Sequence, residues 1–204
     1  MKARSMLAVG VFGIAVAVCG AQIQGGEGPM SADAQTVRVT MKNNPVTLVG
    51  TPVREGAAAP DFRVVDAAFK PVKLSDLKGQ VVLISTVPSL DTGVCSMQTK
   101  RFNEEAARLP TNVVVLTISE DLPFAQKRFC EAEKVDRIRV LSDSVWRDFA
   151  AKYGILIENM GLLARSVWIV NQRGEVAYRQ IVPEITNHPD YDAALKAARA
   201  TAGR

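Results

Sequence analysis

Hydrophobic residues form continuous, β-branched runs in the middle of the chain. Val81–Thr86 and Asn112–Ser119 are apolar on both faces, which is typical of strands covered by helices on each side. After these strands, apolar residues at helical spacing predict helices over about Val94–Leu109 and Leu122–Glu133, with Pro123 in the first turn of the second. This alternation of strand and helix predicts an α/β sandwich with a mixed central sheet.

Shorter elements flank this centre. Alternating apolar and polar residues over Val37–Val49, interrupted at Asn43–Pro45, predict an N-terminal β-hairpin. The segment Arg165–Val182 predicts a second hairpin that turns at Asn171–Gly174, and a final helix follows with Asp190 as its N-cap. Further short elements are expected as follows: a strand at Phe62–Val65, a partner at Lys70–Leu74, a helical turn ended by Gly79, a strand in Arg137–Asp143, and a helix through Trp146 and Phe149 that stops near Gly154.

The first residues have the pattern of a signal peptide. Lys2 and Arg4 precede an uncharged apolar run, Met6–Val18, and small residues follow. The run is shorter than the roughly 20 residues of a spanning helix. We therefore expect a signal peptide over residues 1–21, a flexible tether rich in Gly, Ala and Ser over 22–35, and one domain over 36–204. A retained N-terminal anchor is the alternative, and the expected location is periplasmic or exported.

Cys19 is a candidate lipidation site within this leader. The sequence "VAVCG" resembles a lipoprotein processing site, although Val18 is large where such sites have a small residue. A lipid on Cys19 would attach the protein to a membrane. In either case we assign Cys19 to export and not to catalysis.

The charge pattern excludes a nucleic-acid surface. The formal net charge is only +4, part of it belongs to the leader, and the basic residues are scattered along the chain. We therefore expect no nucleic-acid partner.

Cys95 lies at a predicted junction between a strand and a helix. Unpaired backbone N–H groups and the positive end of the helix dipole favour a thiolate there, which is the reactive form. Thr92 lies three residues earlier, so its hydroxyl can face the same small volume, and Pro88 presets the loop. The alternatives are an inert buried cysteine, Thr92 or Asp91 as a simple helix cap, and an ordinary loop proline.

Cys130 gives Cys95 one partner cysteine outside the leader. An even pair in an exported protein is also compatible with one structural disulfide. A non-enzymatic binding module held together by that bond is therefore the non-catalytic alternative.

The motif around Cys95 resembles a known family. Pro88, Thr92 and Cys95 fit the peroxiredoxin motif Pro-x-x-x-Thr-x-x-Cys, and the segment also fits Pro-Ser-Leu-Asp-Thr-x-Val-Cys of the thiol peroxidase branch, atypical two-cysteine type. The similarity continues in "NPVTLVG", "PFAQKRFC", "GLLARSVWIV" and "YDAALKA", so it extends from about Val37 to the C-terminus. It implies a thioredoxin-like fold, with a central mixed sheet flanked by helices and an N-terminal β-hairpin.

The resemblance also implies roles for single residues. Cys95 would be the peroxidatic cysteine, which a peroxide oxidises to sulfenic acid. Thr92 and Pro88 would shape the site, with Thr92 bonding the peroxide and the thiolate. Arg165 in "LLARSVW" would stabilise the developing charge, the alternative being a surface arginine at a strand end. Cys130 would be the resolving cysteine that forms an intrachain disulfide with Cys95.

The same resemblance implies the reaction partners. The substrates would be hydrogen peroxide and organic hydroperoxides, the reductant a thioredoxin or thioredoxin-like dithiol protein, and the assembly a homodimer. No cofactor or metal is expected, because three cysteines and one histidine show no ligand spacing. Because a disulfide needs Cα atoms within about 7 Å, we expect local opening before Cys95 can join Cys130.

Three other cysteine chemistries fit the sequence less well. Cys95 to Arg101 matches Cys-x5-Arg of cysteine phosphatases, but the five residues between them lack glycine and continue a helical pattern. A thiol protease needs a histidine base, and we expect His188, in the loop before the last helix, at the surface. A disulfide reductase would need Cys-x-x-Cys, which is absent.

Overall fold

The computed structural model describes residues 38–203. The predicted signal peptide, the predicted tether and Cys19 lie outside the described residues. Within the described part of the chain, no helix combines the length and the apolar character needed to cross a membrane.

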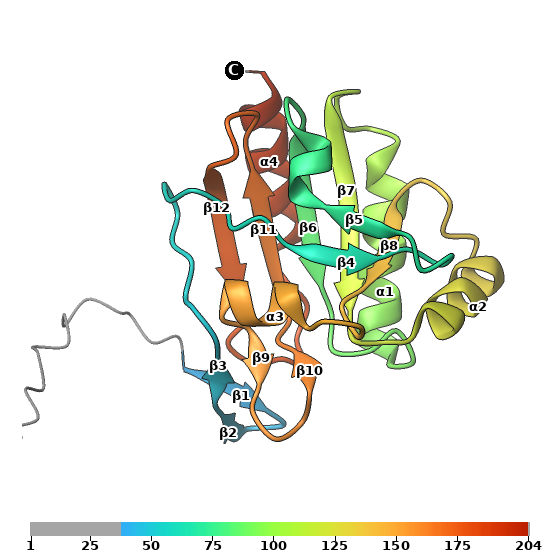
Figure 1. Ribbon diagram of the computed structural model, residues 1–204, viewed down its shortest axis with the longest axis vertical. Coiled ribbons are helices and arrows are strands. Elements are labelled where there is room, and N and C mark those ends of the chain that lie inside the picture. Colours follow the sequence, from blue (N-terminus) through green and yellow to red (C-terminus); the bar gives the residue numbers. More distant parts are fainter. Residues whose placement is uncertain (1–37, 204) are drawn as a thin grey trace, which may run out of the picture. The chain divides into compact units, whose positions relative to one another are not determined.

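A seven-stranded mixed sheet is the centre of the fold. Its strands are β4 (Arg63–Val65), β5 (Pro71–Lys73), β6 (Val81–Thr86), β7 (Val113–Ser119), β8 (Arg139–Ser142), β11 (Ser166–Val170) and β12 (Val176–Ile181). They lie in the order β12-β11-β6-β7-β8-β4-β5 (Figure 1). The three central strands β6, β7 and β8 are parallel, and the outer strands are antiparallel to their neighbours. The predicted mixed α/β sheet is confirmed.

Helices cover both faces of this sheet (Figure 1). They are α1 (Gly93–Ala106), α2 (Pro123–Glu133), α3 (Asp148–Tyr153) and α4 (Tyr191–Ala202), and η1 (Leu74–Leu77) is a 3-10 turn. On one face of β6, Leu83 packs in a cluster with Phe102 of α1 and Leu195 of α4. On the other face, Ile84 packs in a cluster with Phe149 of α3. Because helices cover both sides of the sheet, β6 needs apolar residues on both of its faces.

The N-terminal hairpin is confirmed, but its second arm is shorter than predicted. β1 (Val39–Met41) pairs with β2 (Asn44–Val46) around a turn at Lys42 and Asn43, which both have positive φ. The residues expected to continue the arm form β3 (Leu48–Val49), which pairs with β9 (Leu156–Ile157), the neighbour of β10 (Leu162–Leu163). These two-residue strands are too short for a periodic signal in the sequence.

The predicted helix through Trp146 is wrong at its start. α3 begins only at Asp148, because the buried carboxylate of Asp143 accepts hydrogen bonds from the amides of Phe149 and Ala150 and fixes the first turn there. Trp146 lies before the helix, with the guanidinium of Arg63 3.8 Å from the centroid of its ring. The end of α3 at Gly154, in the left-handed conformation, agrees with the prediction.

Candidate active site

Cys95 lies in the first turn of α1, at the carboxyl end of β6. β6 ends at Thr86, a short loop follows, and Thr92 is the N-cap of α1. The side chain of Cys95 is 0% exposed. First-turn amides of a helix have no intrahelical partner, so this position presents partial positive charge to the sulfur.

Arg165 is the polar partner of this sulfur. It directly precedes β11, is only 2% exposed, and donates from Nη2 to Sγ of Cys95 at 3.2 Å. Its other nitrogens are also bound: Nη1 donates to Oε1 of Gln98 and Nε to the carbonyl of Ile185, both at 2.7 Å. A guanidinium held by three acceptors stabilises negative charge on the sulfur at a fixed place.

The strand pairing puts Arg165 beside α1. Ser166 at the start of β11 pairs with Thr86 at the end of β6. The hydroxyl of Thr86 donates to the carbonyl of Ala164 at 2.7 Å and lies 2.6 Å from the hydroxyl of Ser166. The two neighbours of Arg165 are therefore both bound to the last residue of the strand that leads to Cys95.

Gln98 is a buried residue of this site that is not among the predicted site residues. It lies one turn after Cys95, and its Nε2 donates to Oγ of Ser85 at 2.7 Å and to the carbonyl of Thr86 at 3.3 Å. The amide thus orients Arg165 with its oxygen while its nitrogen binds β6. The sequence signal that could have identified Gln98 is a glutamine three residues after the cysteine, on the face of the helix that packs against the sheet.

Thr92 and Pro88 lie in the loop that leads to Cys95. The hydroxyl of Thr92 donates to the carbonyl of Ser89 at 3.0 Å, and its side chain makes no capping bond to α1. Its oxygen remains able to accept a hydrogen bond from a ligand. Pro88 is buried in the same loop.

Cys95 and Cys130 are both free thiols in the structure, so the two are not joined as a structural disulfide. Cys130 lies late in α2 and is half-buried. Burial raises the pKa of the Cys130 thiol, and the nearby charge of Glu131 raises it further. The adjacent Phe129 packs against the small cluster of Val87, Leu90 and Cys95.

The alternative chemistries lack their structural requirements. Residues 95–101 continue as helix α1, and Arg101 pairs with Glu105 at 3.1 Å, so no phosphate-binding loop forms there. His188 is exposed, and its Nδ1 lies 2.7 Å from the hydroxyl of Tyr191. No cluster of three or more His, Cys, Asp or Glu side chains suited to a metal ion occurs in residues 38–203.

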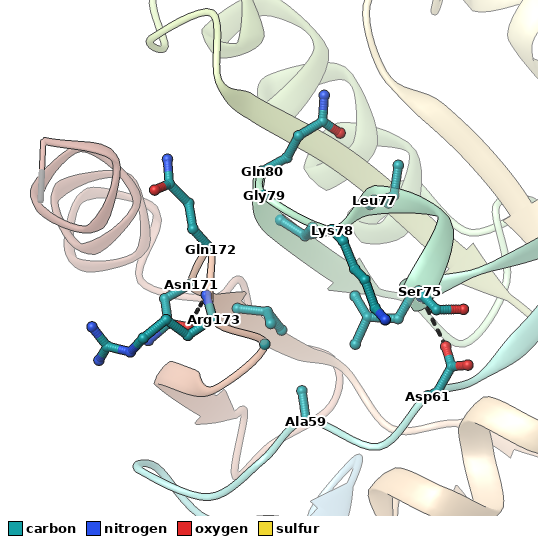
Figure 2. A pocket seen from close by; sticks show the side chains of 14 residues that line it. Ala59, Asp61, Ser75, Leu77, Lys78, Gly79, Gln80, Asn171, Gln172 and Arg173 are labelled. Carbon is teal, nitrogen blue, oxygen red and sulfur yellow. Dashed lines mark hydrogen bonds between the residues drawn. The ribbon is translucent and has the colours of Figure 1, made fainter.

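A separate cavity of about 260 Å³ lies at the other end of β6 (Figure 2). Leu74 and Val82 form part of its apolar wall, and Lys78 also lines the cavity. None of its lining residues belongs to the Cys95 site.

Solved structures share this fold. The chain superposes on a peroxiredoxin-like protein from Aquifex aeolicus with a TM-score of 0.77 and 45% identity, covering 81% of this chain and 97% of that one. It also superposes on a thiol peroxidase from Chromobacterium violaceum with a TM-score of 0.70 at 22% identity, covering 78% and 93%. The second likeness concerns the fold alone.

A buried thiol held by a guanidinium at the carboxyl end of a thioredoxin-like sheet defines a cysteine-dependent redox enzyme. The family profile described as Redoxin matches residues 54–195. The thiol peroxidase of Oceanobacillus iheyensis is 52% identical over 157 residues, covering 77% of this chain and 95% of that protein. The thiol peroxidase of Bacillus subtilis is 49% identical over 162 residues, which are 79% of this chain and 96% of that protein. The chain therefore belongs to the thiol peroxidases of the peroxiredoxin and redoxin family, which reduce hydroperoxides by cysteine chemistry.

Proposed function

We propose that Cys95 is the peroxidatic cysteine of this enzyme, that Cys130 resolves it, and that a thioredoxin-like dithiol protein recycles it. The hydrogen bond from Arg165 to the sulfur of Cys95 carries the proposal. A buried guanidinium that donates to a buried sulfur, with its other two nitrogens also bound, is costly as a purely structural device. It is well suited to hold the anion that attacks a peroxide.

The first step is a two-electron oxidation of Cys95. Its thiolate attacks the terminal peroxide oxygen, the O–O bond breaks, and the leaving alkoxide or hydroxide takes up a proton to become an alcohol or water. The sulfur is left as sulfenic acid. Arg165 stabilises the charge that spreads over sulfur and oxygen, and Thr92 accepts a hydrogen bond from the bound peroxide.

The second step joins the two cysteines. The sulfur of Cys130 attacks the sulfenic sulfur of Cys95, water leaves, and an intrachain disulfide forms. A dithiol reductant then exchanges with this bond, returns both thiols and becomes a disulfide itself. Because Cys95 is buried and Cys130 lies in another helix, the loop and first turn of α1 open for this step.

The proposed partners are a second copy of the chain and an exported reductant. Met97 near the start of α1, with Leu122 and Phe124 at the start of α2, are large apolar side chains exposed close to the site, as expected of a homodimer contact. The leader at residues 1–21, with Cys19 as its candidate lipidation site, supports a periplasmic or exported enzyme. Such a location requires a thiol relay outside the cytoplasm.

One experiment tests these roles together. Mass spectrometry of the mature protein after one equivalent of peroxide should find a disulfide between Cys95 and Cys130. Cys130→Ser should stop at one added oxygen on Cys95 and lose turnover, and Cys95→Ser should consume no peroxide. Full turnover by Cys130→Ser with a dithiol reductant would contradict its resolving role. The same spectra report the leader cleavage site and any lipid on Cys19.

A further inference from the structure

The carboxylate of Asp121 is bound to the loop that precedes Cys95. Its Oδ1 accepts from the hydroxyl of Ser89 at 2.7 Å, and its Oδ2 accepts from the amide of Leu90 at 2.8 Å. Ser119, at the end of β7, donates to the same carboxylate at 2.8 Å. Hydrogen bonds to a carboxylate are stronger than bonds between neutral groups. Asp121 therefore binds the loop before Cys95 to the neighbouring strand.

The loop in turn carries the start of α1. The carbonyl of Ser89 accepts hydrogen bonds from both the amide and the hydroxyl of Thr92, the N-cap of α1. An unbroken series of contacts thus runs from Asp121 through Ser89 to the turn that contains Cys95.

Asp121 also stands at the start of the helix that contains Cys130. It directly precedes Leu122, the N-cap of α2, and its carbonyl accepts from the hydroxyl of Ser142 at 2.6 Å. Gln126 of α2 has bonds of its own to both neighbouring strands: it donates to the hydroxyl of Ser119, which also bonds Asp121, at 3.0 Å and to the carbonyl of Leu141 at 2.8 Å. Release of the Asp121 carboxylate would therefore free the loop before Cys95 while α2 keeps its own bonds to β7 and β8.

We propose that Asp121 is the positioning residue that sets how readily the Cys95 loop opens toward Cys130. The inference rests on the proposed function, since it needs Cys130 as the resolving cysteine. With its bonds made, the carboxylate holds Cys95 beside Arg165 for attack on peroxide. When the bonds to Ser89 and Leu90 break, the loop leaves β7 and the Cys95 sulfenic acid condenses with the Cys130 thiol, releasing water.

Two reactions compete for the sulfenic acid, and Asp121 decides between them. In the closed loop, a second peroxide oxidises the sulfenic acid to sulfinic acid and is itself reduced to alcohol or water. In the open loop, the disulfide forms instead. A stronger hold by Asp121 therefore favours fast first oxidation and greater sensitivity to excess peroxide, and a weaker hold favours the disulfide.

Asp121→Ala tests the inference directly. Loss of the two charge-assisted hydrogen bonds to the loop, from Ser89 and Leu90, should lower the sulfinic fraction at a fixed peroxide excess about fivefold and slow the first oxidation of Cys95 about tenfold. Intact-mass spectrometry gives the first quantity, and stopped-flow fluorescence in a Cys130→Ser background gives the second. The amide oxygen of Asp121→Asn can still accept from Leu90. Its sulfinic fraction and its oxidation rate should therefore lie between those of Asp121→Ala and those of the parent.

Asp76→Ala is the matched control. Asp76 accepts one amide hydrogen bond, from Lys73 at 2.9 Å, at the other end of β6. A purely structural loss would lower the melting temperature of both variants but leave the sulfinic fraction unchanged. If Asp121→Ala does not fold, Ser89→Ala takes its place. It removes the hydroxyl that donates to Asp121, together with the long bond of 3.3 Å that this hydroxyl accepts from the amide of Asp91.

The wild type, measured in parallel, separates this inference from the proposed function. If it forms the Cys95–Cys130 disulfide while Asp121→Ala and Ser89→Ala keep the parental sulfinic fraction and oxidation rate, the role of Asp121 is overturned alone. If the wild type forms no such bond, both are overturned.

Discussion

The guanidinium of Arg165 donates to the sulfur of Cys95 at 3.2 Å, across 70 positions of sequence. Arg165 cannot turn away, because Gln98 and the carbonyl of Ile185 bind its other nitrogens. Such preorganised charge stabilisation needs no rearrangement when the negative charge moves from sulfur to oxygen. The pair is thus the centre of the chemistry proposed for this enzyme.

Gln98 should affect both the reaction and the fold. Gln98→Ala leaves Nη1 of Arg165 and the hydroxyl of Ser85 without their partner. We expect first oxidation of Cys95 to slow about tenfold and the free energy of unfolding to fall by about 1–3 kcal/mol. Stopped-flow oxidation and urea unfolding measure these quantities. Glu104→Ala, at an exposed position of α1, is the control, and an unchanged oxidation rate in Gln98→Ala would refute the positioning role.

Cys130 should react faster as the pH rises. Burial and then Glu131 raise the pKa of its thiol, so near neutral pH the thiolate that attacks the sulfenic acid is scarce. Disulfide formation should therefore accelerate into the alkaline range. Glu131→Gln removes the smaller cause and should speed the step at neutral pH about twofold, since Glu131 is exposed and its charge is screened. Quenched-flow alkylation follows the bond, and a pH-independent rate would argue against this assignment.

Glu120 should make the stability of the fold depend on pH. Burial, and then the charge of Asp143, raise the pKa of Glu120 from 4.5 to about 7, and its buried oxygens have no hydrogen-bond partner within residues 38–203. The folded state keeps a proton that the unfolded chain has already released. The free energy of unfolding should therefore fall as the pH rises from about 4.5 to about 7.

Glu120→Gln removes the part of this dependence that Glu120 causes, and Asp143, whose pKa burial raises to about 6, keeps its own smaller part. Above neutral pH the variant should be more stable than the wild type by roughly 1–3 kcal/mol, after allowance for screening by solvent and for the loss of Arg147, 3.8 Å away. Urea unfolding at several pH values gives the comparison. Glu158→Gln, at an exposed carboxylate, should leave the profile unchanged. Parallel wild-type and Glu120→Gln curves would refute the interpretation.

The elements around Cys95 follow from the sequence because their signals are local. Val81–Thr86 is a strand with the predicted bounds, and α1 begins at Gly93, one residue before its predicted start. Cys95 therefore lies in the first turn, as its position after an apolar strand indicates. The ends of the helices depend instead on tertiary contacts. The carboxylate of Asp143, for example, binds the amides of the first turn of α3 and so places the start of this helix after Trp146.

The partners of Cys95 were harder to predict without a family resemblance. Arg165 reaches the sulfur only through the antiparallel pairing of Ser166 with Thr86, which no local pattern specifies. Gln98 and Asp121 have ordinary polar sequence surroundings, and their roles depend on which buried donors and acceptors the folded chain brings to them. Periodicity predicts burial, but it does not predict which polar group a buried side chain meets.

Replacement of Arg165 tests the central claim most directly. In a Cys130→Ser background, the second-order rate constant for oxidation of Cys95 by hydrogen peroxide should fall about 10²–10³-fold in Arg165→Lys, because lysine cannot make the three bonds of the guanidinium. Arg173→Lys, at an exposed position in the turn after β11, should match the parent. An Arg165→Lys rate within about twofold of the parent would contradict the account, since even one lost charge-assisted bond should cost more than that.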